Sequence, residues 1–403
     1  MVMTRTVTEL RAPAAEPRSV TVLGSTGSVG TNTIDMIDRN PGAYRVEALT
    51  AHGNVDLLIE QSLRLKPRLA VTGKEENYEK LKAGLAGTGI EVAAGRAAVI
   101  EAADRPAEWV MASIVGAAGL EPTLAAVRRG ALIGLANKET LVCAGSLMMK
   151  EVAKHKATML PVDSEHSAIF QVFDFDKIPA IGKIILTASG GPFRTKTYAE
   201  MTEMTPAQAV AHPNWSMGAK ISVDSASMMN KGLELIEAHH LFGLPESQID
   251  ILVHPQSVIH SMVAYRDGSV LAQLGTPDMR TPIAYALGWP NRIEAPSARL
   301  DFAKISQFTF EAPDPERFPA LRLAREALKA DGRAPTILNA ANEIAVASFL
   351  GNEIRFTDIA AVVETVLEKL PVGRLESIDD VLATDAEARD VARVEVAARR
   401  KNS

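Results

Sequence analysis

Two carboxylates follow one apolar run of the chain at a spacing that suits metal binding. Asp163 and Glu165 come directly after residues 157–162, which read as a short buried strand. Side chains two residues apart at a strand end can point into one site, and carboxylate oxygens are the ligands that hard divalent cations prefer. Asp163 and Ser164 are also good helix-capping residues, so the pair taken alone fits a helix start equally well.

A second polar group lies further along, within residues 212–238. Asn230 and Glu234 are four residues apart and share one face of a helix, with Lys231 beside that face. An amide, an ammonium and a carboxylate at a helix start could hold a phosphate or a metal ion. With the earlier acids Asp163 and Glu165, Glu234 gives three carboxylates for one hard cation, and we predict a divalent metal site.

A glycine-rich turn follows the first apolar strand. Residues 20–23 run into Gly24, Gly27 and Gly30, and residues 31–39 are compatible with a helix. Glycines at such a turn let the backbone approach a pyrophosphate, and the helix N-terminus adds partial positive charge. The spacing is G-x-x-G-x-x-G and not the stricter G-x-G-x-x-G, but the strand, turn and helix occur in the required order. A dinucleotide site is predicted here.

The end of the second strand indicates which dinucleotide. Residues 44–50 read as a strand that is followed by His52, Gly53 and Asn54, with no acid to bind a ribose diol. A 2′-phosphate would not be repelled, and the neutral donors could hold it. The pattern favours NADP over NAD, although His52 and Asn54 could instead cap the next helix, near Val55.

Strands and helices alternate up to about residue 162, which is the pattern of a doubly wound, Rossmann-like parallel sheet. The predicted strands are residues 19–23, 44–50, 68–72, 89–93, 109–114, 131–135 and 157–162. Ligands bind at the carboxyl edge of such a sheet. Asn137, Lys138 and Glu139 end the sixth strand and are therefore candidate cofactor contacts, with a solvated loop as the alternative for Lys138 and Glu139.

The chain then changes character. We expect an NADPH-binding domain over residues 18–162 and a mixed α/β catalytic domain over residues 163–290. Within the second, residues 190–218 are rich in Gly, Pro, Thr and Met and suit a hinged lid with Trp215 on its apolar face. Arg266-Asp267-Gly268 between two strand-like runs, 257–265 and 269–274, predicts a hairpin.

The C-terminal part is expected to be helical. Residues 291–314 read as a proline-punctuated linker with a strand-like patch at 307–310, and residues 315–403 as a helical bundle. Its four predicted helices are residues 320–329, 335–350, 356–370 and 377–393. The first 17 residues are expected to be a disordered extension.

Composition narrows the class of protein. The 403 residues carry 43 basic and 49 acidic side chains, a net charge of −6, which argues against a nucleic-acid surface. One cysteine, Cys143, excludes an internal disulfide. We find neither the apolar core of a secretion signal nor an apolar run long enough to cross a membrane, and expect a cytoplasmic protein.

Several long motifs carry a resemblance to a known family. They include GSTGSVG (24–30), ANKE (136–139), PVDSEH (161–166), HPNWSMG (212–218) and ISVDSASMMNKGLE (221–234). The chain resembles the 1-deoxy-D-xylulose 5-phosphate reductoisomerases. The resemblance implies conversion of 1-deoxy-D-xylulose 5-phosphate to 2-C-methyl-D-erythritol 4-phosphate in isoprenoid precursor biosynthesis. It also implies NADPH, a divalent ion (Mn²⁺, Mg²⁺ or Co²⁺) and a homodimer.

The resemblance assigns roles residue by residue. The metal ligands are Asp163, Glu165 and Glu234, which together with Lys231 and His212 form the predicted catalytic set. The substrate contacts are Ser164, Glu165, Ser189, His212, Trp215, Ser225, Asn230, Lys231 and Glu234. The predicted cofactor contacts are Ser25, Thr26, Gly27, Ser28, Val29, His52, Gly53, Asn54, Asn137, Lys138, Glu139 and Gly218. Of these, the resemblance itself implies Thr26, Gly27, Ser28, Val29, Asn137 and Glu139.

One position departs from the family pattern. Relatives often carry a basic residue where this chain has Gly53, so we expect a smaller preference for NADPH over NADH than in those relatives. The alternative function is an NADP-dependent aldehyde or polyol phosphate reductase that does not isomerise its substrate. The three carboxylates argue against it, because hydride transfer alone needs no such site.

Overall fold

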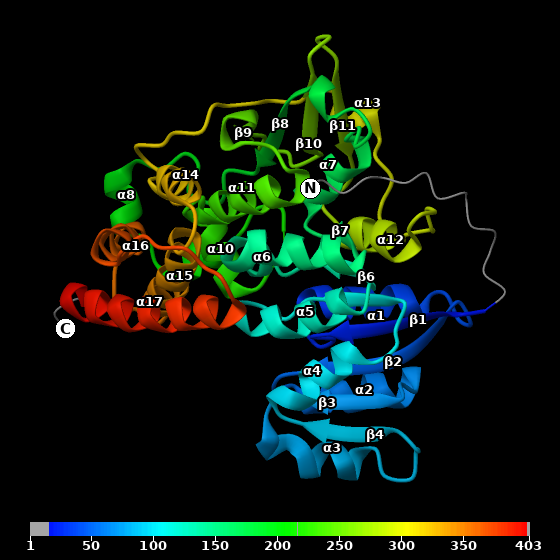
Figure 1. Ribbon diagram of the computed structural model, residues 1–403. Coiled ribbons are helices and arrows are strands. Elements are labelled where there is room, and N and C mark those ends of the chain that lie inside the picture. Colours follow the sequence, from blue (N-terminus) through cyan, green and yellow to red (C-terminus); the bar gives the residue numbers. More distant parts are fainter. Residues whose placement is uncertain (1–15, 216, 401–403) are drawn as a thin grey trace. The chain divides into compact units, whose positions relative to one another are not determined.

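The computed structural model describes residues 16–215 and 217–400, so residues 1–15 of the predicted extension lie outside the described residues (Figure 1). The chain forms two compact units, which are described separately. The first unit comprises Met1–Thr140, Met148–Phe170 and Asp278–Ala298, and the second Leu141–Leu147, Gln171–Pro277 and Arg299–Ser403. The domain boundaries expected from the sequence stay a prediction.

The first unit contains a parallel sheet of seven strands. The strands are β1 (Arg18–Leu23), β2 (Tyr44–Ala51), β3 (Leu69–Thr72), β4 (Glu91–Ala94), β5 (Trp109–Ala112), β6 (Leu132–Leu135) and β7 (Thr158–Pro161). All seven predicted strands are confirmed to within two residues at each end. Apolar side chains such as Val20, Val22 and Trp109 are fully buried, as expected for a parallel sheet covered on both faces.

The strand order explains where a ligand can bind. The sheet runs β4-β3-β2-β1-β5-β6-β7, so the chain moves outward from β1 in one direction and then continues from β5 on the other side. In such sheets ligands bind at the carboxyl ends of the strands where the direction reverses, which here is between β1 and β5. This is the predicted doubly wound fold, and it places the glycine-rich turn after β1 at that point.

The helices of this part of the chain follow the strands in order. They are α1 (Ser28–Asp38), α2 (Val55–Leu65), α3 (Tyr78–Gly84), α4 (Arg96–Asp104), α5 (Leu120–Arg128), α6 (Glu139–His155), α7 (Ser164–Val172) and α12 (Arg280–Gly288). The sequence pattern does not predict α12. In the structure α12 packs on β6 and β7, and the indole Nε1 of Trp109 donates to the carbonyl of Ala286 at 3.0 Å.

The second unit contains a mixed sheet of four strands. In the order β11-β10-β8-β9 these are β11 (Val270–Leu274), β10 (Ile259–Tyr265), β8 (Ile181–Ala188) and β9 (Ile249–Val253). The predicted hairpin is confirmed: Gly268 has a φ of +91°, and the Ser269 amide donates to Asp267 Oδ1 at 2.8 Å. Strand β9, parallel to β8, was not predicted.

Helices make up the rest of the second unit. They are α8 (Tyr198–Thr202), α9 (Pro206–Val210), α10 (Ala219–Ala226), α11 (Met229–Phe242), α13 (Phe302–Ile305), α14 (Ala320–Ala330), α15 (Ala334–Leu350), α16 (Asp358–Lys369) and α17 (Ile378–Arg399). The four predicted C-terminal helices are confirmed. The strand-like patch at residues 307–310 of the predicted linker does not form a strand, and next to it Glu311 forms an isolated bridge with Val253. Among the described residues, no helix combines the length and apolarity needed to cross a membrane.

Candidate active site

The turn after β1 is built from glycine and exposed backbone. Gly24 has a φ of +83°, and a Cβ added to Gly30 would lie 2.1 Å from the Gly24 carbonyl oxygen, so neither position accepts a side chain. Helix α1 begins at Ser28, and its N-cap Gly27 makes no side-chain capping bond. The amides of the first turn can therefore bind an anion. Around this turn Ser25 is buried, Thr26 and Val29 are half-buried, and Gly27 and Ser28 are exposed.

The second strand ends as the sequence predicts, with neutral groups. His52, Gly53 and Asn54 are all exposed. Asn54 Oδ1 accepts the Leu57 amide at 3.3 Å and so caps α2, which was one of the two roles expected for this residue. Only the side-chain oxygen of Asn54 takes part in this cap, and its Nδ2 group does not.

Asn137, Lys138 and Glu139 lie between β6 and the first turn of α6, and all three are buried. Asn137 Nδ2 donates to the carbonyls of Ile114 and Gly116, and its Oδ1 accepts the Thr140 amide at 3.1 Å. Asn137 therefore holds the β5 loop to the start of α6, and this gives it a structural role in addition to the predicted cofactor contact. Lys138 is buried and its Nζ lies 2.6 Å from Asp163 Oδ2, so the solvated-loop alternative for Lys138 is wrong. Glu139 is also buried, at the start of α6.

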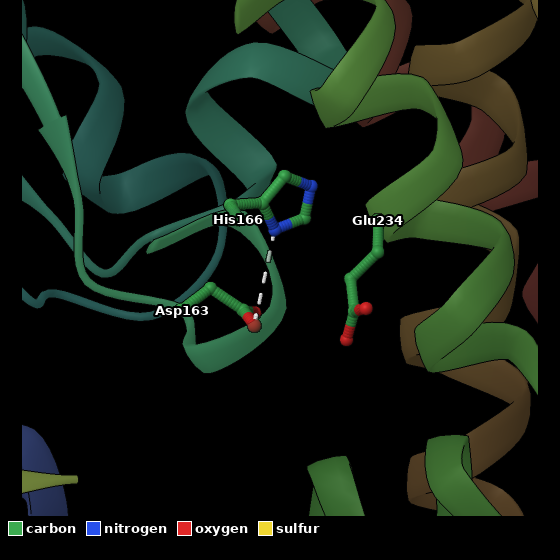
Figure 2. A group of neighbouring side chains, drawn as sticks. All are labelled: Asp163, His166 and Glu234. Carbon is green, nitrogen blue, oxygen red and sulfur yellow. Dashed lines mark ion pairs between the residues drawn. The ribbon is translucent and has the colours of Figure 1, made fainter. Parts of the chain in front are cut away.

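Asp163 is one candidate metal ligand with unusual electrostatics. It lies between β7 and α7, next to Lys138 on the neighbouring strand end, and the fully buried His166 places Nδ1 3.8 Å from Asp163 Oδ1 (Figure 2). Burial raises the pKa of the Asp163 carboxyl, but Lys138 and His166 together hold that pKa well below its usual range. The carboxylate is thus ionised at neutral pH and suited to a cation. Ser164 donates its hydroxyl to the neighbouring Glu165.

His166 was not among the predicted site residues. It stands in the motif that contains Asp163 and Glu165, and it follows Asp163 by three residues, which is one helical turn. That spacing is the signal that could have identified it.

Glu234 is the candidate ligand on α11. Its side chain is 1% exposed and accepts hydrogen bonds from Asn230 Nδ2 and Lys231 Nζ. The expected common face of Asn230 and Glu234 is confirmed, and Figure 2 shows the Glu234 carboxylate projecting from the helix. Lys231 is buried as well, so each of these two acids, Asp163 in one unit and Glu234 in the other, is neutralised by a buried lysine of its own unit.

Ser189 and His212 form a hydrogen-bonded pair in the second unit. His212 Nδ1 accepts the amides of Asn214 at 3.2 Å and Trp215 at 3.0 Å, which leaves the ring proton on Nε2. That nitrogen lies 2.9 Å from Ser189 Oγ. Ser189 Oγ also accepts the Gly191 amide at 3.1 Å. With both interactions made to its lone pairs, the Ser189 hydroxyl can donate its own proton to a ligand.

The same loop packs tightly on α10. A Cβ added to Gly191 would lie 2.5 Å from the Ser225 carbonyl oxygen, so glycine is required for the close approach. Ser225 is half-buried near the end of α10, and α11 begins without a side-chain cap, with Asn230 and Lys231 in its first turn. Hydroxyl groups, the amides of a helix start and an ammonium are each able to bind an anion.

The predicted lid carries two short helices, α8 and α9, each begun by a capping box, of which α8 was not predicted. Asn214 fixes this segment by donating to the Pro255 carbonyl at 2.7 Å. Trp215 is half-buried with its ring centroid 6.2 Å from that of His260, and Gly218 is exposed. A partly accessible tryptophan agrees with the expectation that it is not a core residue.

Comparisons with known proteins agree across the chain. Residues 20–145 match the family described as 1-deoxy-D-xylulose 5-phosphate reductoisomerase, and residues 159–242 and 274–391 match its two C-terminal domain descriptions. The 1-deoxy-D-xylulose 5-phosphate reductoisomerase of Rhodospirillum centenum is 67% identical over 383 residues, covering 95% of each chain. That of Zymomonas mobilis is 57% identical over 375 residues, covering 93% of this chain and 97% of the relative.

Solved structures agree as well. The Zymomonas mobilis reductoisomerase in complex with NADPH has a TM-score of 0.91 at 55% identity, covering 94% of this chain and 99% of that one. A DOX-P reductoisomerase in complex with NADPH, fosmidomycin and magnesium also has a TM-score of 0.91, at 44% identity and 94% and 98% coverage. With these similarities spanning both units, the chain belongs to the 1-deoxy-D-xylulose 5-phosphate reductoisomerase family.

Proposed function

We propose that the sites described above carry out the NADPH- and metal-dependent conversion of 1-deoxy-D-xylulose 5-phosphate to 2-C-methyl-D-erythritol 4-phosphate. The enzyme is an oxidoreductase that also isomerises its substrate, in isoprenoid precursor biosynthesis. The observation that carries this conclusion is the identity of 67% over 95% of both chains with a reductoisomerase. A reductase that does not isomerise its substrate is not favoured.

The turn after β1 fits the pyrophosphate of NADPH. No side chain fits at Gly24 or Gly30, so the backbone of the turn stays accessible to a ligand. The uncapped amides of α1 offer hydrogen-bond donors beside the reversal of the strand order between β1 and β5. When bound, NADPH supplies the hydride that reduces the rearranged substrate. The protein contributes orientation: Asn137 holds the β5 loop against α6 at the same sheet edge.

The acidic residues fit a divalent ion. We propose Asp163, Glu165 and Glu234 as its ligands, because all three offer hard oxygen donors and Asp163 stays ionised beside Lys138. When bound, such an ion polarises the substrate ketone and balances developing negative charge. Magnesium is present in similar reductoisomerase structures, and Mn²⁺ and Co²⁺ would suit the same oxygen donors.

The substrate phosphate is proposed to bind at the anion site of the second unit. Ser189 can donate its hydroxyl proton because His212 and the Gly191 amide interact with its oxygen. Ser225, Asn230 and Lys231 complete the donor set. Lys231 bonds Glu234 in the structure, so a metal ion on that carboxylate would release the ammonium toward the phosphate.

One assay tests this function. The full chain, freed of metal with a chelator and resupplied with Mg²⁺ or Mn²⁺, should oxidise NADPH in the presence of 1-deoxy-D-xylulose 5-phosphate and form the branched product. The metal-free enzyme should be inactive but should still bind NADPH. Reduction of simple aldehyde phosphates at a comparable rate, with no branched product, would support the reductase alternative.

We further propose a homodimer that acts in the cytoplasm, where reductive biosynthesis draws on NADPH. Strand β11 supports the dimer: it is the edge of its sheet, and Val270 and Leu271 are about half exposed. A second copy could pair with this edge. Leu271→Asp should then lower the molecular mass in solution toward that of the monomer, as measured by light scattering, whereas an unchanged mass would exclude this edge as the interface.

A further inference from the structure

The loops after β2 and β3 are joined into one rim. The Gly73 amide donates to the Ala51 carbonyl at 2.7 Å, and Thr72 Oγ1 donates to the His52 carbonyl at 3.2 Å. A Cβ added to Gly73 would lie 2.9 Å from His52 Nδ1, so residue 73 must be small for the imidazole to lie over it. The residue that follows, Lys74, is thereby held at a defined place beside the end of β2.

The side chain of Lys74 lies next to Gly53. A Cβ added to Gly53 would lie 3.8 Å from Lys74 Cε and 4.0 Å from Cδ, which is ordinary contact distance. The ammonium of Lys74 is therefore one bond beyond the atom that approaches residue 53. Lys74, which follows the neighbouring strand β3, therefore brings its positive charge close to position 53.

Among the described residues, the ammonium of Lys74 pairs with one acidic side chain, and this ion pair is weak. Lys74 Nζ lies 3.3 Å from Glu76 Oε1, and both side chains are well exposed, 44% and 73%. An exposed pair of this kind contributes little and is easily exchanged. The neighbouring Lys80 is different, because it bonds Asp56 at 2.7 Å, and Glu75 lies toward Gly95 at the end of β4.

We propose that Lys74 binds the 2′-phosphate of NADPH and sets the preference for NADPH over NADH. It does so beside Gly53, which has no side chain of its own, with the exposed His52 and Asn54 as further donors. A phosphate carries more charge than the Glu76 carboxylate and can take over the ammonium in a charge-assisted bond. This inference rests on the proposed use of NADPH.

Binding measurements on the full chain test it without turnover. NADPH and NADH are titrated by nucleotide fluorescence, and adenosine 2′,5′-bisphosphate and 5′-AMP by competition against NADPH. Lys74→Met keeps the length of the side chain and removes its charge. It should weaken the binding of NADPH and of the bisphosphate about tenfold. The binding of NADH and of 5′-AMP should weaken less than about twofold.

Two further variants make the test specific. Lys80→Met is the matched control, since it removes another exposed, acid-paired lysine nearby, and it should change every dissociation constant less than twofold. Adding Gly53→Arg to Lys74→Met should restore most of the lost preference, because a side chain at position 53 starts 3.8 Å from Lys74 Cε and returns a cation to the same place.

The outcomes separate the two proposals. An unchanged ratio of NADPH to NADH affinity in Lys74→Met, or an equal loss in Lys80→Met, would overturn the role of Lys74 while leaving the reductoisomerase function intact. A parent enzyme that binds neither nucleotide would instead contradict the proposed function. Melting temperatures of the variants confirm that the fold is retained.

Discussion

The two proposed anion sites of this protein are built from different groups. The turn after β1 offers backbone amides and glycine, all within the seven residues 24–30. The site around Ser189, His212 and Lys231 uses side chains from three separate segments. The first depends on shape, and a single methyl group can damage it. The second depends on charge and hydrogen bonds, and its lysine is already engaged by Glu234.

The difference predicts that each site can be lost without the other. A change in the side chains of the second unit should alter metal or substrate binding and leave the cofactor affinity in place. A change in the glycine turn should do the reverse. The variants below test this separation, beginning with the largest expected effect.

Glu234→Gln should produce the greatest loss. It preserves the shape and the possible hydrogen bond with Asn230 but removes the charge that a divalent ion needs. We expect kcat/KM to fall at least about 1,000-fold, a loss of roughly 4 kcal/mol in transition-state stabilisation. The NADPH dissociation constant should stay within about twofold, since the proposed nucleotide site is built from other residues, those of the turn after β1. Activity above a tenth of the parent value would show that Glu234 is not a ligand of the metal ion.

Acid pH should lower the stability of the second unit through protonation of His240 on α11. Burial lowers the pKa of His240 to about 4, with His239 adding to the effect, and the ring lies against Gly145. The folded state therefore favours the neutral ring, and the unfolded chain binds the proton more readily. The contribution of the neutral His240 ring to the free energy of unfolding should be fully present above pH 6.5. It should be lost as the pH falls toward 4, by at most about 3 kcal/mol.

His240→Gln should flatten that dependence. The measurement is the free energy of unfolding between pH 7 and 4 for the parent and the variant, with His155→Gln as a control on a more exposed histidine. Parallel curves for parent and His240→Gln would show that this residue does not carry the acid sensitivity.

Gly30→Ala tests the glycine turn. Its Cβ would lie 2.1 Å from a backbone oxygen, so α1 must shift, and we expect a loss of about 1–3 kcal/mol in stability together with weaker NADPH binding. Gly27→Ala is the matched control for stability, because its Cβ would find only an ordinary contact at 3.5 Å. Affinity for inorganic phosphate at the second site should not change. Equal stability of the two variants would contradict the close approach.

The same contrast explains what could be predicted from the sequence. The seven strands and the glycine turn depend on local patterns, namely apolar runs and the spacing of Gly24, Gly27 and Gly30, and these were found. The common face of Asn230 and Glu234 follows from helix geometry alone.

Other features depend on residues far apart in the chain. The pairing of Lys138 with Asp163 requires β6 and β7 to be neighbours, and Lys74 approaches Gly53 only because β3 lies beside β2. Strand β9 and helix α12 are stabilised by their tertiary partners, β8 and Trp109, and lack a distinctive pattern of their own. Local sequence does not contain this information.

Ser189→Ala is the mildest change and tests the second site. The hydroxyl is expected to donate one hydrogen bond to the phosphate, so its loss should weaken inorganic phosphate and substrate binding about fivefold to tenfold. Ser222→Ala is the matched control, because that hydroxyl bonds within its own helix, to the Gly218 carbonyl at 3.0 Å. NADPH binding should be unaffected in both. An equal effect of the two substitutions would show that the Ser189 hydroxyl has no special role.

A substrate that lacks the phosphate can decide whether phosphate binding also drives closure of residues 190–218. If it does, a substrate without phosphate should show a lower kcat even at saturation, because binding energy at the far end is used in the chemical step. Trp215→Ala should then narrow the difference between the two substrates, since the half-buried ring contributes to closure. Equal kcat values with different KM values would mean that the phosphate only anchors the substrate, because energy used for closure must appear in the rate at saturation.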